Sequence, residues 1–332
     1  MRAMVLEKPA PIENQPLILK ELEIPQPKEN KVLIRVLACG VCHTDLHIVE
    51  GDIIPPRYPI IPGHQVIGRI ENLGARVKEF KKGELVGVPW LHSTCGECKY
   101  CKKGLSNLCE NISFTGFHVN GGYAEYMIAN KTAIYRLPET IDIFSFAPIL
   151  CGGVIGYRAF KLTNLTEGQK LGLVGFGSSA HIVLQIAIHR KMEVYVFSRS
   201  EAHRKKALEM GAKWVGKLGD TFEERLDGII VFAPVGETLI ESLRYVDKGG
   251  TVVSAGIYMS DIPSFPYSLL YEERSLKSTA NSTREDVEET IKLAVEIPIR
   301  PLISTYPLEH ANKALQDVKY SRLDGSAVLI IG

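Results

Sequence analysis

The sequence predicts an α/β protein with two domains, one β-rich and one built on a doubly wound parallel sheet. The length of 332 residues exceeds the usual size of a single domain. The first 135 residues alternate short Val/Ile-rich runs with Gly and Pro. After about residue 150 strand-like and helix-like segments alternate regularly, which is typical of βαβ units.

The composition is that of an ordinary globular protein, with 45% hydrophobic and 23% charged residues. A net charge of +1 gives no indication of a nucleic-acid-binding surface. The N-terminus, MRAMVLEKPAP, lacks the apolar run of a signal peptide, and no stretch approaches the length of a transmembrane helix. We therefore expect a cytoplasmic protein that binds neither nucleic acid nor a membrane.

Individual segments justify this fold class. In the β-rich part the predicted strands include KVLIRVLACG, QVIGRIENLG and ELVGVPW. In the α/β part the predicted strands are KLGLVGF, EVYVFS, DGIIVFAP and GTVVSAG. The predicted helices between them are SAHIVLQIAIHRK, HRKKALEMGA and ETLIESLRYV. A further helix, REDVEETIKLAVE, starts at Arg284, and the segments after it return to a β-like pattern.

Four cysteines gather within one short segment, at Cys95, Cys98, Cys101 and Cys109. In a cytosolic chain this close spacing indicates metal ligands rather than disulfides. Four thiolates complete a tetrahedral zinc site without an open position, so such a site is structural. Binding the metal would itself hold the lobe, residues 92–112, in its fold. The alternatives are four free surface thiols or two disulfides.

The stretch CGVCHTDLH at residues 39–47 concentrates further reactive side chains. From spacing alone, Cys39 and Cys42 are equal candidates for a second metal site.

Together with PGHQ at 62–65, APILCGG at 147–153 and LVGFGSSA at 173–180, these motifs resemble the zinc-containing medium-chain alcohol dehydrogenases. The resemblance covers essentially the whole chain, and the order and spacing of the motifs make it specific. It implies a GroES-like catalytic domain, formed by residues 1–151 and 278–332, and a Rossmann nucleotide-binding domain at residues 152–277. It also implies two zinc ions per chain, a small-molecule alcohol or aldehyde substrate, and a homo-oligomer, either a dimer or a tetramer.

The resemblance assigns the catalytic zinc to Cys42, His64 and Cys151, with one position open for water or a substrate oxygen. Cys39 is then the spare cysteine. The zinc acts as a Lewis acid that stabilises the alkoxide before hydride leaves carbon. For Cys151 taken alone, the alternative is a buried apolar thiol.

The resemblance also implies a proton relay. Thr44 takes the alcohol proton and passes it through the nicotinamide ribose to His47, which faces solvent. Asp45 orients His64 and thereby determines its tautomer. The alternative for His47 is an ordinary solvated polar residue.

Gln65 and Ile155 both depart from the family pattern. Gln65 stands where the family usually has a glutamate close behind the zinc. An amide carries no charge, so the site should be about one charge unit more positive, and we expect a more acidic zinc-bound water or alcohol. Ile155 replaces a common threonine, which would make a contact with the nicotinamide purely apolar.

A cofactor fingerprint, G-x-G-x-x-A, follows one predicted strand and opens a helix. Gly175 allows the tight turn, Gly177 lets the backbone approach the pyrophosphate, and Ala180 keeps helix and strand close. The helix start at Ser178 and Ser179 supplies amide donors for phosphate. The alternative is a plain glycine-rich turn.

The next strand ends in Ser198 and Arg199, where an NAD enzyme normally has an acidic residue. A hydroxyl and a guanidinium would bind a 2′-phosphate, so we favour NADP(H) over NAD(H). The alternative is that Arg199 only covers a helix end.

Later strand ends offer nicotinamide and adenine neighbours, unless they are ordinary turns. These candidates are Ala233, Pro234, Ala255, Gly256 and Ile257.

Two side chains are candidates for the wall of the substrate pocket. Trp90 is bulky and Ile53 is modest, which suits medium-sized alcohols and aldehydes over a broad range. The alternative for Trp90 is a core aromatic without substrate contact.

Two other functions compete with a zinc alcohol dehydrogenase. One is a reductase of the same superfamily that acts on enones or quinones without catalytic zinc. The other is a non-enzymatic sensor that binds zinc or nucleotide, which would not need Thr44 and His47 in relay positions.

Overall fold

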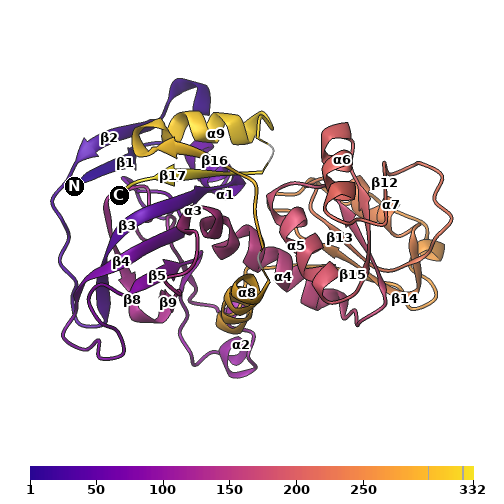
Figure 1. Ribbon diagram of the computed structural model, residues 1–332, viewed down its shortest axis with the longest axis horizontal. Coiled ribbons are helices and arrows are strands. Elements are labelled where there is room, and N and C mark those ends of the chain that lie inside the picture. The colour runs from indigo at the N-terminus through magenta and orange to yellow at the C-terminus, as the bar shows by residue number, and fades with distance from the viewer. Residues whose placement is uncertain (298, 324) are drawn as a thin grey trace. The chain divides into compact units, whose positions relative to one another are not determined.

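A computed structural model describes residues 1–297, 299–323 and 325–332 (Figure 1). The contacts divide the chain into two compact units, which we describe separately. The first unit comprises Met1–Cys151, Asn281–Val295 and Pro301–Gly332, and the second comprises Gly152–Ala280 and Glu296–Arg300. The catalytic and nucleotide-binding roles that we assign to these parts from the sequence stay predictions.

The first unit is built on a mixed sheet with the strand order β16-β17-β3-β4-β5-β9, to which β8 adds by pairing with β3. These strands are β3 (Lys31–Val41), β4 (Gln65–Leu73), β5 (Leu85–Val88), β8 (Tyr126–Asn130), β9 (Tyr135–Arg136), β16 (Ile303–Pro307) and β17 (Ser326–Ile330). The C-terminal strand β17 pairs antiparallel with β3, so the end of the chain returns to the first sheet (Figure 1).

The first unit contains further helices and short strands besides this sheet. Before the four-cysteine lobe they are β1 (Arg2–Leu6), η1 (Ile12–Asn14), β2 (Leu17–Glu21), α1 (His43–Glu50) and β6 (Leu91–Ser93). In and after the lobe they are α2 (Lys99–Lys102), η2 (Ser106–Leu108), β7 (Ser113–Phe114), η3 (Lys131–Ala133), α3 (Ile143–Phe146), η4 (Ala147–Leu150), α8 (Arg284–Glu296), η6 (Leu308–His310) and α9 (Ala311–Lys319).

Helix α9 corrects the prediction that only β-like segments follow α8. Its apolar residues Ala311, Ala314, Leu315 and Val318 recur at helical spacing and are buried. The helix is short and lies between two strands, and its period was therefore missed.

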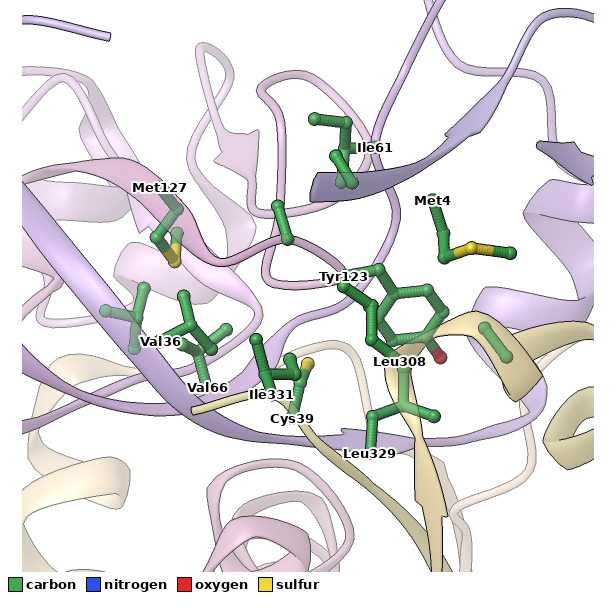
Figure 2. Close-up of a cluster of buried hydrophobic side chains, with 14 of the residues drawn as sticks. Met4, Val36, Cys39, Ile61, Val66, Tyr123, Met127, Leu308, Leu329 and Ile331 are labelled. Carbon is green, nitrogen blue, oxygen red and sulfur yellow. The ribbon is translucent and has the colours of Figure 1, made fainter. Parts of the chain in front are cut away.

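The core of the first unit joins segments that are far apart in the sequence. Figure 2 shows Val36 and Cys39 of β3, Val66 of β4 and Leu329 of β17 within one buried cluster, together with Tyr123. Cys39 is completely buried in this cluster. Burying these apolar side chains ties the C-terminal strand to the sheet that leads into α1.

The second unit contains a parallel sheet with the order β12-β11-β10-β13-β14-β15. Its strands are β10 (Lys170–Val174), β11 (Glu193–Phe197), β12 (Trp214–Gly216), β13 (Leu226–Val231), β14 (Val246–Ser254) and β15 (Ser275–Ser278). In order along the chain this is the 3-2-1-4-5-6 arrangement of the Rossmann fold, which confirms the predicted fold class.

Helices connect and cover these strands, as the alternating sequence pattern predicts. They are α4 (Gly152–Thr163), α5 (Ser178–His189), α6 (Glu201–Glu209), α7 (Gly236–Ser242) and η5 (Tyr267–Leu269). Helix α5 packs on β10 and β11, and α7 packs on β13 and β14. The close approach of α4 to α5 uses Gly156, where an added Cβ would lie 2.6 Å from a methyl carbon of Val183.

Within the described residues, no single helix has the length and hydropathy needed to cross a bilayer. The helical segments Ile143–Leu150 and Gly152–Thr163 meet those two criteria only when they are taken together across a bend.

Candidate metal centres and nucleotide site

The candidate catalytic centre begins where strand β3 gives way to helix α1. Cys42 is the N-cap residue of this helix, and its backbone N–H donates to Oδ2 of Asp45 at 3.1 Å. A carboxylate three residues after the N-cap is a common way to satisfy the free N–H groups of a helix start. The sequence Cys-His-Thr-Asp therefore places the Cys42 thiol at a helix N-terminus.

The same carboxylate orients His64 from the other side. The His64 Nδ1–H donates to Asp45 Oδ1 at 3.0 Å, and the Gly63 backbone N–H donates to the same oxygen at 3.1 Å. Asp45 and His64 are both completely buried. With Nδ1 committed to the carboxylate, Nε2 is the ring atom available to a metal.

Three donor atoms converge at this point. The sulfurs of Cys42 and Cys151 each lie 3.3 Å from His64 Nε2, and the three atoms lie within 4.8 Å of one another. Cys151 reaches the site from the end of the short helix η4. Two sulfurs and one imidazole nitrogen match the donor set of a catalytic zinc site that keeps one position open.

The electrostatics of these residues also suit a cation. The Cys151 thiol and burial raise the pKa of Cys42, so two adjacent thiolates are favoured only when a positive ion lies between them. Burial alone disfavours the imidazolium, but the Asp45 carboxylate and the Cys42 sulfur outweigh it and raise the pKa of His64 to about 10. Surroundings that favour a proton on His64 equally favour a metal ion at the same nitrogen.

The four cysteines of the lobe also come together. Their sulfurs lie within 4.8 Å of one another, with Cys95 at 4.0 Å from Cys101 and 3.5 Å from Cys109. Sulfurs around a tetrahedral zinc at about 2.3 Å are about 3.8 Å apart, so the lobe fits that ion. The backbone N–H of Cys98 donates to Cys95 Sγ at 3.3 Å, which holds the first two cysteines of the lobe together. All the cysteines in the structure are free thiols, so the disulfide alternative is not supported.

The predicted relay residues both lie on helix α1. Thr44 is buried, and the half-buried His47 follows one turn later on the same face. The His47 Nδ1–H donates to Asp52 Oδ2 at 2.7 Å. Asp52 was not predicted from the sequence because it lies beyond the helix end, where Gly51 adopts a left-handed conformation and turns the chain back.

The predicted pocket residues lie beside these groups. The Trp90 ring meets the His64 ring edge-on, with centroids 4.8 Å apart and an interplanar angle of 70°. Trp90 also stacks on Phe114 at 4.6 Å. Ile53 lies close to His47, whose carbonyl accepts a hydrogen bond from the Ile53 N–H at 3.2 Å.

Gln65 is the first residue of β4 and is almost completely buried. It pairs with Gly40 of β3, and an added Cβ on Gly40 would lie 2.6 Å from Gln65 Oε1. The Nε2 group of Gln65 has no hydrogen-bond partner among the described residues. A buried amide with an unsatisfied donor is unusual and points to a site that has more than a packing role.

The fingerprint turn lies between β10 and α5. Gly175 adopts φ +86°, and its N–H donates to the carbonyl of Phe197 at 2.8 Å, which joins it to β11. A Cβ added to Gly177 would meet nothing within 4 Å, so the protein leaves open space over this residue. Ser178 and Ser179 form the first turn of α5, and Ala180 is completely buried.

His181 is a further residue of this turn that the sequence analysis missed. Its Nδ1–H donates to the Gly177 carbonyl at 3.1 Å. Burial lowers the pKa of His181 to about 4, so its ring is neutral at neutral pH. A neutral ring bonded to this carbonyl stabilises the turn without adding charge.

The other predicted cofactor residues lie at the carboxyl ends of neighbouring strands. An added Cβ on Gly175 would lie 3.4 Å from the Ala233 nitrogen, and one on Gly256 would lie 3.2 Å from Pro234 Cα. The N–H of Ala255 donates to the last carbonyl of β13 at 2.8 Å, and Ile257 beyond it is exposed.

At the end of β11, Ser198 is buried and Arg199 is exposed. Arg204 lies beside them, because its Nη1 donates to the carbonyls of Ser198 at 2.7 Å and Arg199 at 3.0 Å. Two guanidinium groups therefore flank the end of this strand.

Comparisons with known proteins agree with this architecture. Residues 28–139 match the family described as "Alcohol dehydrogenase GroES-like domain", and residues 180–296 match "Zinc-binding dehydrogenase". The chain is 40% identical over 337 residues to a probable alcohol dehydrogenase of Mycobacterium tuberculosis, covering 100% of this chain and 97% of that protein. It is 34% identical over 322 residues to an alcohol dehydrogenase of Geobacillus stearothermophilus, covering 94% and 95%. The chain belongs to the zinc-containing medium-chain alcohol dehydrogenase family.

Solved structures show the same fold. A thermostable alcohol dehydrogenase from Pyrobaculum aerophilum, with cobalt and zinc bound, superimposes with a TM-score of 0.90 at 25% identity, covering 99% of each chain. A cinnamyl alcohol dehydrogenase from Sorghum bicolor gives 0.90 at 25% identity, covering 99% of this chain and 97% of that one. The zinc-type dehydrogenase architecture therefore extends over both units.

In this family member the role of Asp45 can be tested by Asp45→Asn. The amide keeps one oxygen acceptor, but its NH₂ group would face an N–H donor in place of the second oxygen. We expect the zinc affinity of the Cys42 site to fall by about 10- to 100-fold, while the zinc in the four-cysteine lobe stays bound. Competition with a chromogenic chelator measures both sites.

Asp52→Asn is the matched control, because Asp52 contacts His47 and no predicted metal ligand in the hydrogen bonds described above. It should leave both zinc affinities unchanged. Zinc affinity in Asp45→Asn equal to that of the wild type would show that the carboxylate does not orient His64.

Proposed function

We propose that this oxidoreductase is a zinc-dependent alcohol dehydrogenase that transfers hydride reversibly between an alcohol and NADP(H). The observation that carries the proposal is the convergence of Cys42, His64 and Cys151 next to a helix that carries Thr44 and His47. A reductase without catalytic zinc would not need these three ligands, and a sensor would not need the two relay residues.

The proposal assigns a zinc ion to the Cys42, His64 and Cys151 site and a second one to the four-cysteine lobe. Zinc in the first site would supply Lewis acidity toward the substrate oxygen. In the lobe all four donors are sulfur, so a zinc there would have only a structural role.

The side chains of this chain would then move the proton. Thr44 would accept it from the alcohol at its hydroxyl oxygen while giving up its own hydroxyl proton in the direction of His47, and His47 would release a proton to solvent. Because Nδ1 of His47 is held by Asp52, Nε2 is the atom that would exchange the proton. Asp45 would keep His64 in the tautomer that leaves Nε2 for the metal.

The substrate that we propose is a medium-sized primary or secondary alcohol, or the matching aldehyde or ketone. The aromatic face of Trp90 beside His64 supports an apolar substituent next to the reacting carbon. Relatives named alcohol dehydrogenase support the same substrate class. The homo-oligomer expected from the resemblance stays a prediction.

The first experiment follows NADPH and NADH oxidation with a panel of aldehydes and ketones. We expect turnover that a zinc chelator abolishes, and two zinc ions per chain in the purified protein. Cys42→Ser should lose one zinc and the turnover. Cys39→Ala should keep both, because Cys39 lies in the core and outside the ligand cluster.

Absence of turnover with both cofactors, in protein that holds two zinc ions, would contradict the proposed reaction. Equal loss of zinc in Cys42→Ser and Cys39→Ala would contradict the ligand assignment.

The preference for NADP(H) is supported by the end of β11. No carboxylate follows this strand directly, and Arg199 and Arg204 flank Ser198. In Arg199→Asp we expect the KM for NADPH to rise roughly tenfold or more, because a charged hydrogen bond is replaced by repulsion. The KM for NADH should stay the same or fall.

Arg225→Asp is the matched control for this charge change. Arg225 is exposed and precedes β13, so it lies at the amino end of a strand, away from the carboxyl ends that carry the predicted site. An unchanged ratio of the two KM values in Arg199→Asp would refute the NADP(H) assignment.

Gln65 provides a test of pH dependence. A neutral side chain behind the metal leaves the site more positive, which lets the alcohol proton leave at lower pH. In Gln65→Glu the rise of kcat/KM with pH should move to higher pH by roughly 0.5–1 unit. Superimposable pH profiles for the two proteins would show that the side chain at position 65 does not affect the proton transfer.

A further inference from the structure

We propose that Asn281 is a positioning residue that holds the indole of Trp90 beside His64 and links it to the four-cysteine lobe. In this role it makes the enzyme selective for alcohols with a flat apolar substituent. The selectivity part of the inference rests on the proposed function, whereas the positioning part does not.

One amide side chain makes both connections. The Trp90 indole N–H donates to Asn281 Oδ1 at 3.1 Å, and Asn281 Nδ2 donates to the backbone carbonyl of Asn107 at 3.3 Å. The first bond spans 191 positions in the sequence and the second spans 174. Asn281 therefore joins three segments of the first unit that the chain order separates.

The backbone at Asn281 suits this role. Its φ is +51°, in the left-handed region that asparagine tolerates better than most residues. It is the first residue of the segment that returns to the first unit. Two residues later, Thr283 exchanges hydrogen bonds with Asp286 at 2.8 and 3.1 Å, which anchors the start of α8. The amide is therefore held close to a fixed helix start.

The hydrogen bond to Asn281 leaves only the apolar carbon surface of the indole to face the candidate site. Nε1 is the only polar atom of a tryptophan side chain. With the indole N–H donated to Asn281, the remaining ring atoms are carbon, and the ring contacts Phe114 and His64. A fixed carbon surface beside a predicted metal ligand favours flat apolar groups and disfavours hydroxylated ones.

The bond to Asn107 connects this wall to the lobe. Asn107 lies in the short helix η2, between the sulfur ligands Cys101 and Cys109. A metal bound by those sulfurs would hold the Asn107 carbonyl in place, and through it the Asn281 amide and the Trp90 ring. The four-cysteine lobe would thus influence selectivity without touching substrate.

The test uses Asn281→Gly, which removes both bonds and keeps the left-handed backbone free of strain. Asn164→Gly is the matched control, because Asn164 has φ +58° and is exposed in the second unit. Asn281→Asp separates the two bonds: it keeps an oxygen for Trp90 and loses the donor to Asn107. If Asn281→Gly fails to fold, Asn281→Asp replaces it as the test variant.

The first readout needs no turnover. The chain has two tryptophans, so Trp214→Phe leaves Trp90 as the only tryptophan emitter. In that background we expect Asn281→Gly to shift the Trp90 emission and to increase its quenching by acrylamide, while Asn164→Gly changes neither. Asn281→Asp should keep the emission maximum close to that of the parent.

The second readout is the ratio of kcat/KM for benzyl alcohol to that for ethanol. Asn281→Gly should lower this ratio about five- to tenfold, the effect of losing one neutral hydrogen bond. In a Trp90→Phe background the same substitution should have no further effect, because the indole N–H is already gone. A purely structural role would lower stability and leave the ratio unchanged.

The outcomes are distinguishable. Emission and ratio that do not differ between Asn281→Gly and Asn164→Gly would overturn the inference. A moved emission with an unchanged ratio in an active enzyme would overturn the selectivity part. A moved emission in a protein without turnover on any alcohol would support the positioning role and contradict the proposed function instead.

Discussion

The carboxylate of Asp45 is the group on which the rest of the candidate catalytic centre depends. Its two oxygens accept three hydrogen bonds, from the backbone N–H groups of Cys42 and Gly63 and from Nδ1 of His64. A completely buried carboxylate is costly unless such donors and a nearby positive charge compensate it. Here every donor belongs to a segment that carries a predicted metal ligand. One side chain therefore holds the start of α1, the loop before β4 and the His64 imidazole. A shift of any one of them would break a hydrogen bond to Asp45.

Close packing of glycines brings these segments within reach of Asp45. Gly63 adopts φ +98°, and a Cβ there would lie 2.4 Å from the ring of Tyr123. A Cβ at Gly121 would lie 2.0 Å from the carbonyl oxygen of Gly63. Any larger residue would push the loop, and His64 with it, away from the carboxylate. The same packing explains Cys39, because its sulfur lies in the core beside Tyr123 (Figure 2) and outside the ligand cluster. The nearby C-x2-C spacing therefore combines one predicted ligand cysteine, Cys42, with one core cysteine.

The sequence predicts those parts of the molecule that short motifs or local periodicity encode. The parallel sheet of the second unit follows from the alternation of strand-like and helix-like segments. The turn at Gly175 follows from a short motif whose residues lie next to one another in the sequence. Asp52 was missed although it lies only five positions from His47, because the left-handed Gly51 reverses the chain between them. Asn281 could not be predicted at all, since its two partners are decided by where the returning chain packs in the first unit. Tertiary contacts of this kind leave no local pattern in a single sequence.

The four-cysteine lobe is connected through Asn281 to Trp90 beside the candidate catalytic centre, although the lobe itself would take no part in the reaction. Its donors are all sulfur and leave no open position, so a metal there cannot act on substrate directly. What such a metal can do is remove freedom from the chain between Cys101 and Cys109. A less mobile chain there would also hold the Asn107 carbonyl in place. Because Asn281 is hydrogen-bonded to both that carbonyl and the Trp90 indole, the orientation of the Trp90 ring would be restricted as well. A Trp90 ring held at one angle would present the same surface to every substrate, so rigidity at the lobe would become selectivity beside His64.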